Sequence, residues 1–149
     1  MKRTLLIGML IFTIISHAQN KQSSINAITK TVQNYYDGYI ERDINKLNAA
    51  FDTLNGTMKV PILENDKIIG FKNHYFKDLM PKWGNRTKLS KEVLQNCALE
   101  ILNIDVVDNT IASVKMSMKV DTITYIDILS LQKKKNDWKI TNKIYVSRK

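Results

Sequence analysis

Residues 112–146 read ASVKMSMKVDTITYIDILSLQKKKNDWKITNKIYV, a stretch in which apolar and polar side chains alternate through three successive runs. Alternation of this kind is typical of strands that bury one face of a sheet. The side chains of the first run that are predicted to point inward are Ala112, Val114, Met116, Met118 and Val120. The apolar positions then change from even to odd numbers near Asp121-Thr122, which indicates a tight turn between two strands.

The other two runs continue the pattern after this turn. The side chains predicted to point inward are Ile123, Tyr125, Asp127, Leu129 and Leu131 in the second run, and Trp138, Ile140, Asn142, Ile144 and Val146 in the last. A turn at residues 135–137 separates the two runs. Residues 97–107 are also rich in strand formers but alternate imperfectly, which predicts a strand with a β-bulge. We therefore expect four antiparallel strands in a meander.

Helical periodicity dominates the front of the chain. Apolar residues recur at three- and four-residue steps across residues 25–40, a spacing that predicts a helix of about four turns. Ser23 or Ser24 is in position to cap this helix, which is expected to run from about Ser24 to Arg42. The helix is therefore expected to lay one broad apolar stripe on the sheet.

Two shorter helices are predicted after the long one. Asp43 is in position to cap the first of them. The apolar face of that helix is expected to be Ile44, Leu47 and Phe51. Asn73 is in position to cap the second, over residues 74–80, and Pro81 is expected to end it because the residue before a proline disfavours helical backbone.

Two short strands, over residues 58–62 and 68–71, are predicted between these helices. Pro61 places the first strand at a sheet edge, because proline cannot donate to a ladder. The resulting order of elements predicts an α+β domain, in which a long N-terminal helix and two shorter helices pack on a curved antiparallel sheet. The 149 residues are 44% hydrophobic and 25% charged, which suits one globular domain, expected over residues 19–149.

The first eighteen residues have the order of a secretory signal peptide. Lys2 and Arg3 precede an apolar run over residues 5–15, and Ser16-His17-Ala18 supplies the small residues of a cleavage site. The run is shorter than the roughly 20 residues that span a bilayer, so no membrane span is expected after cleavage. We expect an exported protein, periplasmic or extracellular. An uncleaved signal anchor is the alternative.

Several classes of protein are excluded by composition. Cys97 is the single cysteine, so no internal disulfide can form, and the histidines and acidic residues show no metal-ligand spacing. A Gly-rich phosphate loop is missing from the sequence, so neither a cofactor nor a metal is expected. The net charge of +9 raises the question of nucleic acid, but the lysines are dispersed and the chain is expected to be exported. We therefore expect no nucleic-acid partner.

The chain resembles the nuclear-transport-factor-like superfamily, also called cystatin-like or SnoaL-like, and within it the small secreted proteins labelled putative lumazine-binding. The residues that carry the resemblance are 32–38 (VQNYYDG), Asp43, 50–51 (AF), 125–131 (YIDILSL) and 137–143 (DWKITNK). The resemblance implies a cone-shaped sheet around a cavity lined by the long helix and the concave face. Both enzymes and binding proteins use this fold, so the resemblance alone does not assign an activity.

Comparison with the ketosteroid isomerases of that superfamily tests for an active site. By resemblance, Tyr35 corresponds to their oxyanion-hole tyrosine and Asp127 to their hydrogen-bond-donating aspartate. Their general base corresponds to a position near Lys59, where this sequence has no carboxylate. Because abstraction of a proton from carbon needs an acceptor, the resemblance implies a polar cavity without a complete catalytic set.

The residues themselves single out Asp127 as a site candidate. It lies on an otherwise apolar strand face, and a buried carboxylate needs partners because its desolvation is costly. It can orient a ligand, as can Asn142 on the last strand, or both can bond to backbone or to Tyr35 within the fold. The predicted ligand-binding residues are Tyr35, Tyr39, Phe51, His74, Trp83, Tyr125, Asp127 and Asn142.

The leading interpretation is an exported, non-catalytic domain that binds a small, partly apolar molecule and forms a homodimer through its sheet. The first alternative is an enzyme of the isomerase or dehydratase type that uses Asp127 and Tyr35. A second carboxylate or His74 within hydrogen-bond reach of Asp127 would favour it. The second alternative is a protein-interaction module, which a filled core and an exposed apolar patch would favour.

Overall fold

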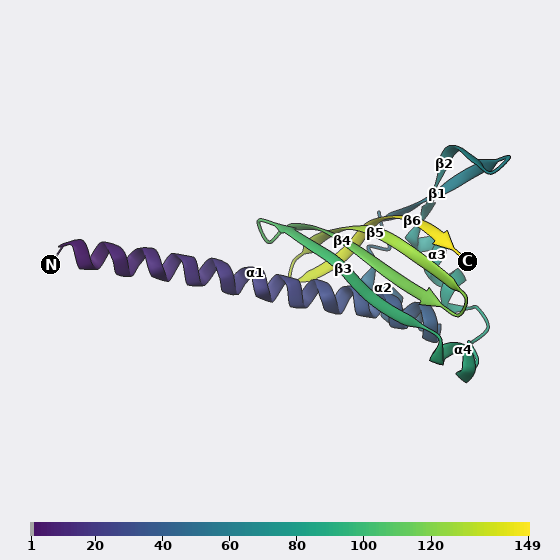
Figure 1. Cartoon of the computed structure of the whole chain (residues 1–149), viewed down its shortest axis with the longest axis horizontal. Helices are drawn as coiled ribbons and strands as arrows, with labels where there is room; N and C mark the ends of the chain where they lie inside the picture. Colours follow the sequence, from purple (N-terminus) through teal and green to yellow (C-terminus); the bar gives the residue numbers. More distant parts are fainter. Residues whose placement is uncertain (1) are drawn as a thin grey trace.

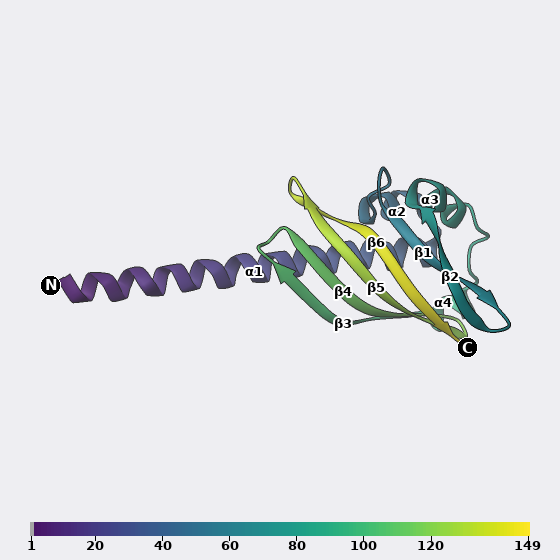
Figure 2. The same ribbon diagram turned by 90° about the horizontal axis from the view of Figure 1, so that it is seen from above.

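The computed structural model describes the backbone of residues 2–149 and the side chains of residues 21–149. Its elements are α1 Lys2–Glu41, α2 Ile44–Ala50, β1 Thr57–Glu64, β2 Lys67–Tyr75, α3 Phe76–Gly84, α4 Lys91–Gln95, β3 Ala98–Val107, β4 Ile111–Val120, β5 Ile123–Lys134 and β6 Asp137–Arg148. The strands form one curved sheet in the order β2-β1-β6-β5-β4-β3, which α1 crosses (Figure 1 and Figure 2). The predicted α+β fold is confirmed, including the four-stranded meander.

Helix α1 begins at Lys2, well before the predicted start near Ser24, and its first turns extend beyond the sheet (Figure 1). The predicted signal peptide, residues 1–18, falls where side chains are outside the described residues, so it stays a prediction. Ser24 is the first buried residue among the described side chains, and Ile28 and Val32 follow it on the face that packs on the sheet. No helix within the described part of the chain is both long enough and apolar enough to cross a membrane.

The meander follows the predicted alternation through β4 and β5. On β4 the buried residues are Ala112, Val114, Met116 and Met118, and on β5 they are Asp127, Leu129 and Leu131. The turns carry left-handed residues at Asp121 (φ 55°) and at Asp108 and Asn109 (φ 49° and 52°), a conformation that Asp and Asn tolerate. The predicted bulge in β3 is also confirmed, since its pairing with β4 shifts between Ile101 and Asn103.

The predicted inward face of β6 is right up to Ile140 and wrong beyond it. Ser130 pairs with Asn142 while Leu131 pairs with Ile140, so Thr141 is one extra residue in β6. A bulge of this kind exchanges the two faces of the strand after it. Ile144 and Val146 are consequently exposed, and Lys143, only 3% exposed, enters the interior.

Strand β1 is not an edge strand, because it pairs with β2 on one side and, in parallel, with β6 on the other. The sheet is therefore mixed rather than wholly antiparallel. The parallel pairing covers only Thr57–Lys59, so it ends before Pro61, and the missing N–H of the proline removes no bond from it. Strand β2 runs to Tyr75, which places Asn73 in the strand and not at a helix cap.

The short helices agree with the sequence only in part. Asp43 caps α2 as predicted, accepting bonds from the backbone N–H groups of Asn45 (2.8 Å) and Lys46 (3.2 Å). Ile44, predicted to lie on the apolar face of α2, is 37% exposed. Helix α4, which Ser90 caps through a bond from the backbone N–H of Val93 (3.3 Å), was not predicted.

Pro81 lies inside α3 and does not end it, contrary to the prediction. A proline deprives a helix of one backbone hydrogen bond, and here it does so in the second half of a nine-residue helix. The apolar face compensates for that loss by packing into the core. Its buried residues are Phe76, Leu79, Met80 and Trp83.

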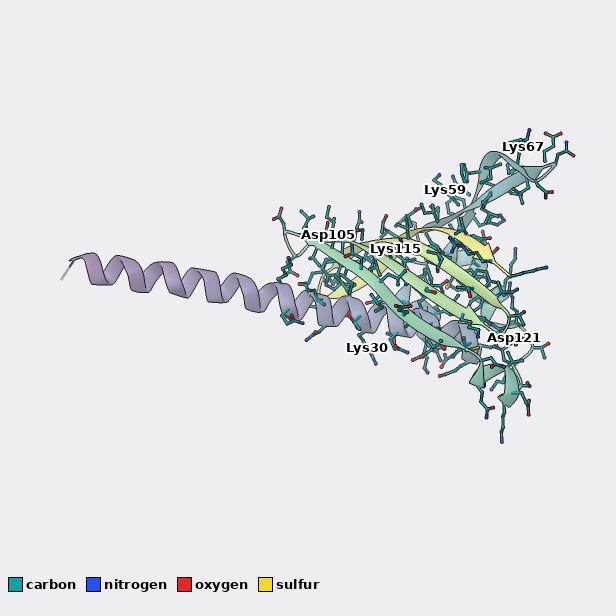
Figure 3. All side chains as sticks on the ribbon, viewed as in Figure 1. Lys30, Lys59, Lys67, Asp105, Lys115 and Asp121 are labelled. Atoms are coloured by element: carbon teal, nitrogen blue, oxygen red, sulfur yellow. The ribbon has the colours of Figure 1, made fainter. Side chains whose placement is uncertain are left out.

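The surface carries dispersed positive charge and exposed apolar side chains on several elements. Figure 3 shows Lys30, Lys59, Lys67 and Lys115 on four different elements. The hairpin of β1 and β2 projects from the sheet (Figure 1). Exposed apolar residues of this hairpin are Ile62, Leu63, Ile68, Ile69 and Phe71, and those of β5 and β6 are Ile128, Ile144 and Val146. The homodimer through the sheet stays a prediction.

Gly56 allows a close approach between the start of β1 and α3. A β-carbon at this position would lie 2.5 Å from Cδ2 of Phe76 and 2.6 Å from the carbonyl oxygen of Asp52. That carbonyl accepts the N–H of Gly56, and the carbonyl of Gly56 accepts the N–H of Phe76. Neither contact can therefore open without loss of a hydrogen bond.

We expect Gly56→Ala to lower the free energy of unfolding by about 1–3 kcal/mol, because the added methyl group overpacks the site. Chemical denaturation measures the change. Gly70→Ala is the matched control, since a β-carbon there would have its nearest neighbour, Cδ1 of Ile62, at 3.8 Å. Equal effects of the two substitutions would contradict the assigned packing.

Candidate functional site

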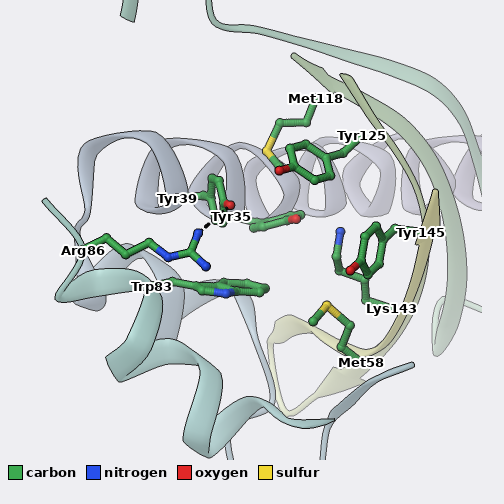
Figure 4. Close-up of a pocket in the computed structure, with 9 residues that line it drawn as sticks. All are labelled: Tyr35, Tyr39, Met58, Trp83, Arg86, Met118, Tyr125, Lys143 and Tyr145. Carbon is green, nitrogen blue, oxygen red and sulfur yellow. Dashed lines mark hydrogen bonds between the residues drawn. The ribbon is translucent and has the colours of Figure 1, made fainter. Parts of the chain in front are cut away.

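A pocket of about 190 Å³ lies between α1, α3 and the inner face of the sheet (Figure 4). Its lining combines five aromatic rings, two methionines and two cations, and none of the lining residues is acidic. The lining residues are Tyr35, Tyr39, Met58, Trp83, Arg86, Met118, Tyr125, Lys143 and Tyr145. The pocket is therefore apolar at its walls and positively charged at two points.

Local sequence explains how these side chains meet. Tyr35 and Tyr39 are four residues apart and share one face of α1. Met118 and Tyr125 follow the inward alternation of β4 and β5, where they pair across the two strands. Lys143 and Tyr145 point inward because the bulge at Thr141 has exchanged the faces of β6.

The aromatic residues hold one another in place. The rings of Tyr35 and Trp83 are stacked at a centroid distance of 6.1 Å, and Tyr39 meets Trp83 edge to face at 5.3 Å. Phe51 packs against this group, and its ring centroid lies 4.9 Å from that of Tyr35 and 4.4 Å from that of Phe76. Offset and edge-to-face contacts of this kind are favourable, so the aromatic walls stabilise one another without a ligand.

A buried ion pair forms the inner end of the pocket. The ammonium group of Lys143 pairs with Oδ2 of Asp127, and the two side chains are 4% and 0% exposed. The hydroxyl of Tyr35 donates to the same Oδ2 at 2.9 Å. Oδ1 of Asp127 is buried and has no hydrogen-bond partner among the described residues. Asp127 therefore joins α1 to β6 and retains an unused acceptor.

Burial shifts the ionisation of both partners of Asp127. Desolvation lowers the pKa of Lys143, although the neighbouring carboxylate acts in the opposite direction. Desolvation, followed by the charge of Asp127, raises the pKa of Tyr35 well above its usual value. Tyr35 is thus a phenol at neutral pH, and Lys143 gives up its proton more readily than an exposed lysine does.

Arg86 is the second cation of the pocket and belongs to the loop after α3. It is exposed, and its Nη1 donates to the hydroxyl of Tyr39 at 2.8 Å. Figure 4 shows Arg86 and Lys143 at opposite sides of the pocket, with Tyr35 and Trp83 between them. Arg86 forms no ion pair with any acidic side chain that the structure describes. Its charge is therefore available to a ligand.

The structure brings four of the eight predicted site residues into the lining of the pocket, namely Tyr35, Tyr39, Trp83 and Tyr125. Asp127 bonds to two lining residues without lining the pocket itself. The other three lie elsewhere. Phe51 is a buried core residue, His74 is half-buried on β2, and Asn142 donates to the backbone oxygen (3.3 Å) and Oγ1 (3.0 Å) of Thr57.

Sequence reasoning missed five lining residues, of which Lys143 is the most consequential. Met118 was assigned to an inward face but not to the site, Lys143 and Tyr145 alternate with the residues predicted to point inward, and Met58 and Arg86 were not singled out. One available signal was the need of a buried Asp127 for a cation, which a lysine on the adjacent strand could supply. Among the described side chains, residues 21–149, no group of three or more His, Cys, Asp or Glu residues is placed to hold a metal ion.

The ion pair makes a prediction about stability. Asp127→Asn retains an acceptor for Tyr35 but leaves the ammonium of Lys143 buried without a counter-ion, so we expect a loss of about 3–5 kcal/mol in the free energy of unfolding at neutral pH. Lys143→Met alone should cause a similar loss. The double variant removes both charges and should lose less than either single variant. Losses in chemical denaturation that simply add would show that the two groups are not coupled.

Comparisons with known proteins agree with this geometry at the level of the fold. No curated protein is significantly similar to the chain in sequence. An NTF2-like protein of unknown function from Shewanella baltica OS155 has a TM-score of 0.70 and 21% identity, covering 85% of this chain and 95% of its own. An NTF-2 like protein of unknown function from Silicibacter pomeroyi DSS-3 has a TM-score of 0.69 and 15% identity, covering 86% of this chain and 98% of its own.

A further structure is named as a putative scytalone dehydratase, from Novosphingobium aromaticivorans DSM 12444. It has a TM-score of 0.58 and 13% identity, with 89% of each chain covered. At sequence identities this low, the structural similarity establishes a shared fold but no shared activity. Residues 23–146, nearly the whole of the described domain, match the family described as Putative lumazine-binding. The chain therefore belongs to the putative lumazine-binding family and has the nuclear-transport-factor-like fold.

Proposed function

We propose that this domain binds a small, planar molecule that carries an anionic or carbonyl oxygen, and that it does so without catalysing a reaction. The observation that carries the proposal is the lining of the pocket. Five aromatic rings surround it, Arg86 and Lys143 stand at its two sides, and no carboxylate faces into it. A flat ring stacks on such walls, and oxygen atoms of the ligand accept hydrogen bonds from the two cations.

The size of the pocket limits the ligand. Pockets for drug-sized molecules commonly measure about 300–1,000 Å³, and this one measures about 190 Å³. It therefore suits a molecule of about one or two fused rings. Membership of the putative lumazine-binding family supports the same class, because lumazine is a planar heterocycle with carbonyl oxygens. An open pocket of this volume also argues against the protein-interaction module with a filled core.

The alternative of an isomerase- or dehydratase-type enzyme has one observation in its favour, the 2.9 Å hydrogen bond between Tyr35 and Asp127. Such an enzyme still needs a general base. Among the hydrogen bonds and ion pairs of the described residues, Asp127 contacts neither a second carboxylate nor His74, and its charged partner is Lys143. Binding without catalysis is therefore the function we propose.

Lumazine itself is the probe that tests this proposal. Titration with the full chain should quench tryptophan fluorescence, because Trp83 lines the pocket, and Trp83→Phe should abolish most of the quenching. We expect Arg86→Ala to weaken binding by about tenfold, since a hydrogen bond to a charged group contributes about 1.5–3 kcal/mol. Arg148→Ala, which removes the same charge from the exposed end of β6, is the matched control. Unchanged fluorescence of the wild-type protein would refute the assignment to planar heterocycles.

We also propose that the protein is exported and that its signal peptide is removed after Ala18. The order of residues 2–18 supports this proposal, as does the position of Ser24 as the first buried side chain among those described. Cleavage would shorten α1 without removing any described contact with the sheet. The intact mass of the exported protein should correspond to a chain that begins at Gln19. A mature protein that retains residues 5–15 would contradict this.

A further inference from the structure

Lys143 places a primary amine at the inner wall of the pocket. Its Nζ lies 5.2 Å from the ring centroid of Tyr35 and 4.9 Å from that of Tyr145, in the space that Figure 4 shows between these rings. It is the only amine among the lining residues. A lysine that served only to neutralise Asp127 would not need to line a pocket, so its position calls for a second role.

We propose that Lys143 captures a carbonyl ligand as a reversible imine, with Asp127 as the group that accepts and returns the proton. This inference rests on the proposed pocket and names the chemical class of its ligand more closely. The ligand is a small aromatic aldehyde or ketone whose carbonyl carbon faces Lys143.

Reaction with a carbonyl carbon requires the neutral amine, since an ammonium group has no free electron pair. Burial favours that form here, whereas the charge of Asp127 favours the ammonium group. The side chain of Lys143 is nearly excluded from water, and Oδ2 of Asp127, which pairs with the ammonium group, is placed to accept its proton when the neutral amine forms. This burial lowers the pKa of Lys143, as is typical of lysines that form Schiff bases.

The proposed step balances within the pair. Lys143 transfers one proton to Asp127, and the neutral nitrogen attacks the carbonyl carbon, forming the C–N bond. A second proton moves from nitrogen to the former carbonyl oxygen, which gives a carbinolamine. Asp127 then returns its proton to the hydroxyl group, the C–O bond breaks, and water leaves. The product is a protonated imine beside the Asp127 carboxylate, so the net charge of the site is unchanged.

The rest of the pocket suits a carbonyl compound with a polar group at its far side. Arg86 faces Lys143 across the rings of Tyr35 and Trp83 and can bind a phenolate oxygen (Figure 4). A ring with an aldehyde at one end and an ionisable hydroxyl at the other matches both cations. 4-Hydroxybenzaldehyde has this form, and one ring is within the size limit of the pocket.

The experiment treats the full chain at neutral pH with 4-hydroxybenzaldehyde and sodium cyanoborohydride, which converts an imine to a stable amine, and maps the label by mass spectrometry of peptides. We expect the label on Lys143 at a level about tenfold above that of any exposed lysine, because the exposed amines are almost wholly protonated. Label confined to exposed lysines or the α-amino group would overturn the proposal.

Two variants test whether the label is specific to Lys143. Lys143→Arg keeps a positive charge for Asp127 but cannot form an imine, so its folded protein should lose the label. Lys119→Arg, at an exposed lysine on β4, should retain the label on Lys143. The map of the wild-type protein decides the proposal even if Lys143→Arg does not fold.

4-Hydroxybenzyl alcohol separates this proposal from the proposed function, because it has nearly the same shape without the carbonyl group. Its binding is measured by quenching of Trp83 fluorescence, with Trp83→Phe as the control. If the alcohol binds and the aldehyde is never trapped on Lys143, the imine is refuted and the pocket stands. If neither compound binds or is trapped, both proposals fail for this class of ring.

Discussion

The bond from Asp127 to Lys143 and Tyr35 is the constraint on which the rest of the site depends. It joins three elements that are distant in sequence, α1 through Tyr35, β5 through Asp127 and β6 through Lys143. Burying two charges is expensive, and apolar residues of similar volume commonly give equal or greater stability. The pair is therefore poorly explained as a stabilising device. It is better explained by what it does for the pocket, where it holds an amine and a phenol ring in fixed positions.

That arrangement depends in turn on one extra residue in β6. The bulge at Thr141 lets Trp138 and Ile140 fill the core at one end of the strand and Lys143 and Tyr145 face the pocket at the other. Without it, the strict alternation of the strand would direct Ile144 and Val146 inward. The same sequence would then enclose an apolar core with an unpaired Asp127. The bulge thus converts a packing surface into a polar site.

Prediction from sequence succeeded where one local rule acted alone. Alternation in β4 and β5, the Asp43 cap and the turn at Asp121 each depend on neighbouring residues only. It failed where pairing between distant segments decided the outcome. The bulge in β6 is visible only against β5, and the parallel pairing of β1 has no local signal. Pro81 stayed in a helix because burial of the apolar face of α3 outweighed one lost hydrogen bond. The candidate site lacked Lys143 and Tyr145 because the bulge in β6 was not predicted.

The lining of the pocket has a thermodynamic consequence. Its residues come from α1, β1, α3, β4, β5 and β6, and they span the chain from Tyr35 to Tyr145. No fragment, and no partly unfolded form that lacks one of these elements, retains a complete site. A ligand therefore binds only forms in which all of these elements are folded, and each increment of its binding free energy raises their stability against unfolding by mass action. Occupancy of the pocket and the unfolding of these six elements are in this sense linked equilibria.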